Sequence, residues 1–210
     1  MGSIKSFNEQ NFTSLCDKLA KKDTGLAAII NQYGHPPMWK RPATFETLIH
    51  IILEQQVSLA SALAALNKLK QRLPEITPQS FLSLSNEDLK ACYFSRQKII
   101  YTQHLATELF SGQLILDKLT LMDNDEVRTT LTKIKGIGNW SVDIYLMMVL
   151  QRCDLFPLGD VALMTSVRET KNLPKETTKD EIAAIAGKWK PYQTIAAFIL
   201  WHGYLSRRKR

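Results

Sequence analysis

The sequence feature that most limits the fold is a stretch over residues 142–150 that is apolar on nearly every side. Its apolar positions are Val142, Ile144, Tyr145, Leu146, Met147, Met148, Val149 and Leu150. A helix without a polar face is stable only when other parts of the chain cover it all round. We therefore expect a buried helix over 140–152 at the centre of the fold, with the other elements packed around it.

The remaining sequence also has the periodicity of helices rather than strands. Apolar residues recur on one helical face over 45–57, and leucines form a second stripe over 59–73. Ser85, with Asp88 three residues later, is typical of a capping box at a helix start. Glycine is scarce, at 9 of 210 residues, and alternating β-branched runs are few. The chain is therefore predicted to be all-α, with roughly ten helices.

Composition and charge narrow the class of protein further. No apolar run approaches the about 20 residues that a membrane span needs. The three cysteines, Cys16, Cys92 and Cys153, are too few for a four-cysteine iron–sulfur or zinc site, and they favour a reduced compartment. The net charge of +7 is compatible with nucleic acid, but the last four residues supply +4 of it. The basic tail over 206–210 either grips phosphate or is a solvated end.

A sharp turn between two helices is predicted at residues 136–138, which read Gly-Ile-Gly. The free N–H groups and the positive dipole of the following helix would form an anion site. Lys133 and Lys135 lie beside it, so a DNA phosphate is the expected guest; a plain helical hairpin without a ligand is the alternative. A dinucleotide site is excluded, because Ser141 stands where a third glycine is needed and no buried strand precedes the turn.

Four segments in a fixed order identify a family resemblance. Residues 131–141 read Leu-x-x-Ile-x-Gly-Ile-Gly-x-Trp-Ser, and residues 154–160 read Asp-Leu-Phe-Pro-Leu-Gly-Asp. Residues 45–58 end in Leu-Glu-Gln-Gln-Val-Ser, and residues 189–201 read Trp-Lys-Pro-Tyr-x-x-x-Ala-x-x-x-Leu-Trp. Together they resemble the helix-hairpin-helix DNA glycosylases, and within them the 3-methyladenine DNA glycosylase II group. The resemblance extends over about 39–204, and its motifs are specific only in combination.

The resemblance implies that Asp160 is the catalytic residue. From the residues alone Asp160 is a helix N-cap, because it follows a glycine and precedes an apolar run. Both roles can hold, since a capping carboxylate is fixed at a helix start. In the family role the carboxylate stabilises an oxocarbenium-like sugar as the base departs, and orients the attacking water. Of the neighbouring carboxylates, we expect Asp143 to be a paired structural charge and Asp154 to hold backbone.

Position 140 decides the reaction subclass that the resemblance implies. Relatives that also nick DNA carry a lysine there, whose amine attacks the sugar. Trp140 in this chain therefore implies hydrolysis without lyase activity. Trp140 and Trp201, with Tyr145 as a further candidate, resemble the aromatic residues that stack on a flipped cationic base. Without the resemblance, both tryptophans could equally be core residues.

The resemblance also assigns DNA contacts and a cation site. Gln55 and Gln56 would enter the minor groove, with Gln56 filling the space left by the flipped base; a helix cap or plain loop is the alternative. The expected DNA-binding residues are Gln55, Gln56, Ser58, Lys133, Lys135, Gly136, Gly138 and Ser141. The expected ligands of a structural Na⁺ or K⁺ ion are the main-chain carbonyls of Thr132, Ile134 and Gly136. No other cofactor is expected.

The implied protein is a base-excision repair glycosylase that removes alkylated purines of the 3-methyladenine and 7-methylguanine type. Its fold would have two lobes, 45–135 and 1–44 with 136–205, flanking an active-site cleft. Its partner would be damaged double-stranded DNA, without a membrane, and we expect a monomer. It would act in the cytoplasm at the nucleoid of a bacterium, or in a eukaryotic nucleus. The alternatives are a non-catalytic damage-binding protein and a glycosylase for deaminated or oxidised bases.

The sequence departs from the family pattern in two places. The best-known bacterial relatives carry an N-terminal β-rich domain, and the roughly forty residues before the motifs cannot hold one, so we expect a compact form. The second departure is Tyr93, which stands where glycine is usual. We expect Tyr93 to alter the turn before Arg96 and Lys98, and with it the DNA contacts of those two side chains.

Overall fold

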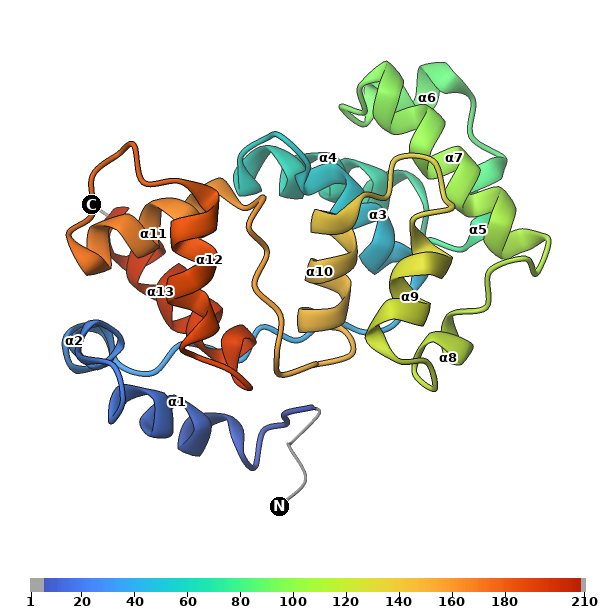
Figure 1. Cartoon of the computed structure of the whole chain (residues 1–210). Coiled ribbons are helices and arrows are strands. Elements are labelled where there is room, and N and C mark those ends of the chain that lie inside the picture. The colour runs from blue at the N-terminus through green and yellow to red at the C-terminus, as the bar shows by residue number, and fades with distance from the viewer. Residues whose placement is uncertain (1–5, 209–210) are drawn as a thin grey trace. The chain divides into compact units, whose positions relative to one another are not determined.

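The structure is a computed structural model that describes residues 6–208 and contains thirteen helices in that range (Figure 1). The β pairing described is a single isolated bridge between Ser6 and Arg152. The all-α prediction is confirmed. Helices exceed the expected number because α5 (Pro78–Leu82) and α8 (Leu116–Leu119) have only five and four residues, too few to show a helical period. The short helix expected after Ser85 is α6 (Asn86–Ala91). None of the described helices is long and apolar enough to cross a membrane.

The chain divides into two compact units. Unit 1 comprises residues 1–40 and 146–210, and unit 2 comprises residues 41–145. Residues 136–145 therefore group with unit 2, whereas the sequence placed them in the other lobe. The reason is local bonding: Gln55 donates to the Gly136 carbonyl, and Arg128 pairs with Asp143 at 2.5 Å.

Unit 2 is built around α3 (Phe45–Glu54) and α7 (Arg96–Phe110), which pack against each other. Helix α4 (Leu59–Arg72) packs on α3, while α5 and α6 pack on α7. Helix α9 (Asn124–Leu131) is followed by α10 (Asn139–Met148), which begins in this unit. The predicted capping box is present, since Ser85 Oγ accepts from the Asp88 amide at 3.1 Å. The short-range polar pattern therefore predicted the start of α6 correctly.

Unit 1 consists of α1 (Phe12–Ala20), α2 (Thr24–Tyr33), α11 (Val161–Lys171), α12 (Lys179–Gly187) and α13 (Gln193–Arg208). Helix α13 packs against α1, α2 and α11, and it is buried without interruption over residues 193–201. An aromatic cluster lies on this helix: Phe198 contacts Phe7, Phe12, Trp39 and Trp201 with ring centroids 5.3–5.9 Å apart.

The apolar helix expected over 140–152 is α10, which ends at Met148. Val142, Ile144, Tyr145, Leu146 and Met147 are buried, as predicted for a helix without a polar face. Val149 and Leu150 lie beyond the helix and are half-buried. The boundary between the two units falls inside α10, after Tyr145.

Part of the basic tail belongs to α13 rather than to a solvated end. Arg207 and Arg208 pair with Glu169 of α11 at 2.9 and 2.7 Å. Lys209 and Arg210 lie outside the described residues. The first two positive charges of the tail are therefore matched by a carboxylate within unit 1.

Candidate active site

The predicted hairpin lies between α9 and α10, and its turn depends on Gly136. Gly136 has φ +90°, and a Cβ built there would overlap the ring of Tyr101 on α7. Glycine is required on both counts, because L-residues rarely adopt this φ and the aromatic ring leaves no room. Ile137 is buried, as expected for a side chain between two helices. At Gly138, by contrast, a Cβ would meet open space.

Two exposed lysines precede the turn. Lys133 and Lys135 are both exposed, and the Lys135 amide donates to Nδ1 of His104 at 3.2 Å, which ties the turn to α7. The side chains of Lys133 and Lys135, which were expected to contact phosphate, are therefore accessible to a partner. The backbone at Lys135 is fixed by its hydrogen bond to α7.

The segment that follows α3 brings Gln55 against the hairpin. Gln55 Nε2 donates to the Gly136 carbonyl and to Ser141 Oγ, each at 2.8 Å. Ser141 is buried, with 3% of its surface exposed. The side chains of Gln55 and Ser141 thus bind one another within unit 2, while Gln55 stays half-buried; that either residue also contacts DNA stays a prediction. The repeated pattern Gln-Gln hides this difference, because the sequence alone does not show which glutamine points inward.

Gln56 is placed differently from its neighbour. It is exposed and adopts φ +58°, in the left-handed region that residues with a Cβ rarely occupy. Ser58 is the N-cap of α4, and its Oγ accepts from the Ser61 amide at 3.1 Å. Ser58 therefore has a structural role, and Gln56 and Val57 are exposed residues of this loop that a partner can reach.

Two anchors of this loop were missed by sequence reasoning. Lys98 Nζ donates to the Leu53 carbonyl at 2.5 Å, and burial lowers the pKa of this ammonium group. Arg41 binds the carboxylate of Glu54 with two hydrogen bonds, at 2.9 and 2.7 Å. Lys98 thus caps the end of α3. Its ammonium group, for which a DNA contact was considered above, binds a carbonyl of unit 2. The partners are 45 and 13 residues apart, so no local pattern could have revealed them.

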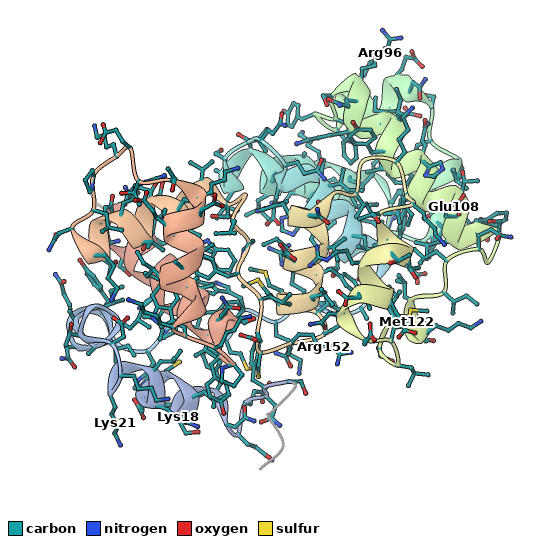
Figure 2. The ribbon with its side chains drawn as sticks, in the orientation of Figure 1. Lys18, Lys21, Arg96, Glu108, Met122 and Arg152 are labelled. Atoms are coloured by element: carbon teal, nitrogen blue, oxygen red, sulfur yellow. The ribbon has the colours of Figure 1, made fainter. Side chains whose placement is uncertain are left out.

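The turn before α7 contains Tyr93, which has an unusual backbone conformation and an exposed side chain. Tyr93 has φ +65° and 64% of its surface exposed. It lines a cavity of about 300 Å³ together with Val57 and Lys98. Arg96 begins α7, is exposed, and projects away from the helix (Figure 2). Arg96, unlike Lys98, is therefore available to an anionic partner.

In unit 1, Asp160 is held by two donors on one oxygen. Its Oδ1 accepts from the Leu163 amide at 2.7 Å, which makes Asp160 the N-cap of α11. The same Oδ1 accepts from Trp201 Nε1 at 3.0 Å. A helix N-terminus and two N–H donors are the surroundings expected for a side chain that caps a helix. The N-cap expectation is confirmed, and Trp201 adds a contact that the spacing of 41 residues concealed.

Trp201 itself is fixed by other aromatic rings of unit 1. Only 8% of its surface is exposed, and its ring lies 5.9 Å from that of Phe198 and 6.4 Å from that of Trp39, measured between centroids. Trp39 thus supports the indole that binds Asp160. A rigid indole keeps its N–H directed at the carboxylate.

The other two aromatic candidates lie in unit 2 and differ in exposure. Trp140 is half-buried in the first turn of α10. Tyr145 is fully buried, and burial raises the pKa of its phenol to about 12. Its hydroxyl has no hydrogen-bond partner within the described part of the chain. The core position of Tyr145 corrects its assignment to a base-binding pocket, whereas Trp140 keeps a surface that a ligand can reach.

The neighbouring carboxylates have structural partners. Asp143 pairs with Arg128 in unit 2, and burial raises the pKa of its carboxyl group. Asp154 Oδ1 accepts from the Gln193 amide at 3.5 Å in unit 1. Both expectations are confirmed: Asp143 is a paired charge and Asp154 holds a backbone amide.

The carbonyls expected to bind a monovalent cation fit that role only in part. The Gly136 carbonyl accepts from Gln55, and the Ile134 carbonyl accepts from the Ile137 amide at 3.0 Å. Each oxygen keeps a second lone pair, but the Gly136 carbonyl is directed at Gln55. Residues 6–208 hold no group of three or more His, Cys, Asp or Glu side chains that could bind a metal.

Comparison with known proteins places the chain in a family. The family model described as HhH-GPD superfamily base excision DNA repair protein matches residues 49–191. DNA-3-methyladenine glycosylase 1 of Schizosaccharomyces pombe is 29% identical over 84% of this chain and 79% of its own length. A DNA-3-methyladenine glycosylase of Bacillus subtilis is 32% identical over 76% of this chain and 57% of its own length.

A solved structure agrees with the family match. The Schizosaccharomyces pombe 3-methyladenine DNA glycosylase in complex with abasic DNA has a TM-score of 0.81 and 28% identity, covering 90% of this chain and 95% of that one. The fold of this chain agrees with this match. The chain belongs to the HhH-GPD superfamily of base excision DNA repair proteins.

Proposed function

We propose that this chain is a monofunctional DNA glycosylase that removes alkylated purines from double-stranded DNA. The observation that carries the proposal is the Asp160–Trp201 pair, in which a capping carboxylate is fixed by a buried indole at 3.0 Å. The names of the relatives support alkylated adenine as a substrate class. Double-stranded DNA is the proposed partner, and a monomer suffices because each unit's candidate residues come from this one chain.

The proposed reaction breaks the bond between the sugar C1′ and the base nitrogen. The base leaves with the bonding electron pair, which neutralises the positive charge that ring alkylation gave it. Asp160 stabilises the resulting oxocarbenium-like sugar electrostatically. Water then bonds to C1′ and loses its proton toward the carboxylate, which leaves an abasic site. Because an alkylated purine is already a good leaving group, little acid catalysis on the base is needed.

The absence of lyase activity is proposed from position 140. A Schiff-base mechanism needs an amine that attacks the sugar, and the indole of Trp140 has no nucleophilic amine. Lys133 and Lys135 precede the turn and are exposed, which suits contact with phosphate. Trp140 would instead stack on the flipped, electron-poor base.

Two further elements belong to the proposal. A Na⁺ or K⁺ ion at the hairpin would draw on the Thr132 and Ile134 carbonyls, with Gly136 as a shared and weaker ligand. The enzyme would act where the chromosome lies, at the nucleoid in a bacterial cytoplasm or in a eukaryotic nucleus.

The test is to identify the bases that the purified chain releases from methylated duplex DNA by mass spectrometry. The proposal expects 3-methyladenine and 7-methylguanine in the supernatant and an intact strand until alkali is added. Release of deaminated or oxidised bases alone would contradict alkylated purines as the substrate class and assign these other bases instead. Binding to damaged DNA without release of any base would leave a damage-binding protein, and strand scission without alkali would contradict the proposed absence of lyase activity.

A further inference from the structure

We propose that Gln55 is a positioning residue, which sets the loop over residues 56–58 against the phosphate-binding hairpin so that Gln56 enters DNA at a fixed distance from the hairpin. This inference rests on the proposed function, because it assumes that the loop and the hairpin bind the same duplex. It concerns contacts within unit 2 alone.

The first argument is the complete use of the Gln55 amide. A side-chain amide nitrogen carries two hydrogens, and here one binds the Gly136 carbonyl and the other binds Ser141 Oγ, both at 2.8 Å. These acceptors lie 81 and 86 residues away in the sequence, on either side of the turn into α10. One side chain thus joins the end of α3 to both the turn and the first turn of the following helix.

The second argument is the contrast between residue 56 and the residues before it. The Leu53 carbonyl is bound by Lys98, the Glu54 carboxylate by Arg41, and the Gln55 amide by the hairpin. The backbone then enters the left-handed region at Gln56, which is exposed. A non-glycine residue in this region is strained, and it persists only where its surroundings hold it. The residues before the loop are therefore fixed by hydrogen bonds. Those of the Gln55 side chain are the nearest in sequence to the strained Gln56.

The third argument is the chemistry of the contact. Two oxygen acceptors require a neutral side chain with two N–H donors, which glutamine supplies and glutamate does not. The bond also fixes the spacing between loop and hairpin before DNA is bound. Without it, the loop would have to be ordered during binding, at a cost in conformational entropy. Loss of the Gln55 contact should therefore impair opening of the base pair more than binding to the DNA backbone.

The test compares Gln55→Met with Gln103→Met as a matched control. Gln103 Nε2 donates to Asn86 Oδ1 at 3.0 Å on another part of unit 2, so the control loses a similar hydrogen bond away from the loop. Base opening is measured by the fluorescence of 2-aminopurine beside an abasic-site analogue, and excision by single-turnover release of 7-methylguanine. Affinity for an undamaged duplex is measured by fluorescence anisotropy.

For Gln55→Met we expect the 2-aminopurine signal to fall, and excision to slow by roughly 10- to 100-fold, as for a misplaced catalytic element. Affinity for the undamaged duplex should stay within about threefold, since the lysine contacts remain. Gln103→Met should match the wild type in all three. A Gln55→Met protein that opens and excises at the wild-type rate, whatever its melting temperature, would overturn the proposal.

A second variant covers the case in which Gln55→Met does not fold. Ser141→Ala removes one of the two acceptors, and alanine fits a buried helical position. For Ser141→Ala we expect a smaller loss of base opening and excision than for Gln55→Met. When Ser141→Ala is combined with a Gln55 variant that folds, the double variant should lose no more than the Gln55 variant alone. Wild-type values for Ser141→Ala would also overturn the proposal. If the wild type itself releases no alkylated base, the proposed function fails instead, and the two failures are distinct.

Discussion

The two units hold their candidate residues in opposite ways. In unit 1, Asp160 and Trp201 are fixed directly, by a helix N-cap and a cluster of buried rings. In unit 2, the residues offered to a partner are exposed, and the backbone behind them is held by polar contacts. The contrast indicates that unit 1 supplies a preorganised charge, whereas unit 2 supplies a shaped and cationic binding surface.

The largest effect on unit 2 should come from Gly136→Ala. The new Cβ would overlap the Tyr101 ring and force alanine to φ +90°. Strain and overpacking together should cost about 2–5 kcal/mol of the free energy of unfolding. Gly138→Ala is the matched control, because its Cβ would meet open space, and it should change stability little. Urea unfolding of both variants measures the difference; equal stabilities would show that the hairpin does not rely on Gly136.

Within unit 1, Trp201→Phe should slow excision by about tenfold or more. The change keeps an aromatic ring but removes the N–H donor to Asp160, and a hydrogen bond to a charged group contributes roughly 1.5–3 kcal/mol. Affinity for undamaged duplex should be unchanged, because this contact lies in unit 1. Single-turnover rates and anisotropy separate the two quantities. A wild-type excision rate would show that the indole acts by stacking alone.

Removing the exposed charges of unit 2 should have the opposite signature. In Lys133→Ala/Lys135→Ala the slope of log affinity against log salt should fall by roughly two, about one for each lost phosphate contact. The excision rate at saturating enzyme should hold. A reduced rate with an unchanged salt slope would place these lysines in the chemistry and would remove the contrast between the units.

The smallest effect concerns Glu169, where Arg208 and Arg207 lower the pKa of the carboxyl group. A carboxyl whose pKa is lowered by folding stabilises the protein above its unfolded value, 4.5, and loses that contribution as pH falls through the folded value. The pairs are partly exposed, so the contribution should stay under about 1 kcal/mol. The melting temperature of Glu169→Gln should therefore lie slightly below that of the wild type at pH 7 and converge with it in acid. A constant difference across this range would show that Glu169 acts by packing.

Features encoded by neighbouring residues were predictable from the sequence. The all-α class, the turn at residues 136–138, the capping box of Ser85 and the N-cap role of Asp160 each depend on residues a few positions apart. The paired charge at Asp143 was also expected, because a charge within an apolar helix needs a partner.

Features that depend on distant contacts were not predictable. The inward direction of Gln55, the Lys98 cap on Leu53 and the support of Trp201 by Trp39 join residues from 45 to 162 positions apart. Tyr145 was misplaced for the same reason, because an aromatic residue in an apolar helix gives no local sign of which side is covered. The family motifs identified the right segments, and tertiary packing decided which side chains face outward.

The most direct test of the account is the single-turnover excision of 7-methylguanine by Asp160→Asn, measured together with its affinity for an undamaged duplex. Asparagine keeps the side-chain oxygen that caps α11 and removes the negative charge. We predict a loss of excision of roughly 100- to 1000-fold, the scale of a removed electrostatic stabiliser, with affinity for undamaged duplex near that of the wild type. Excision at the wild-type rate would contradict the assignment of the chemistry to Asp160 in unit 1.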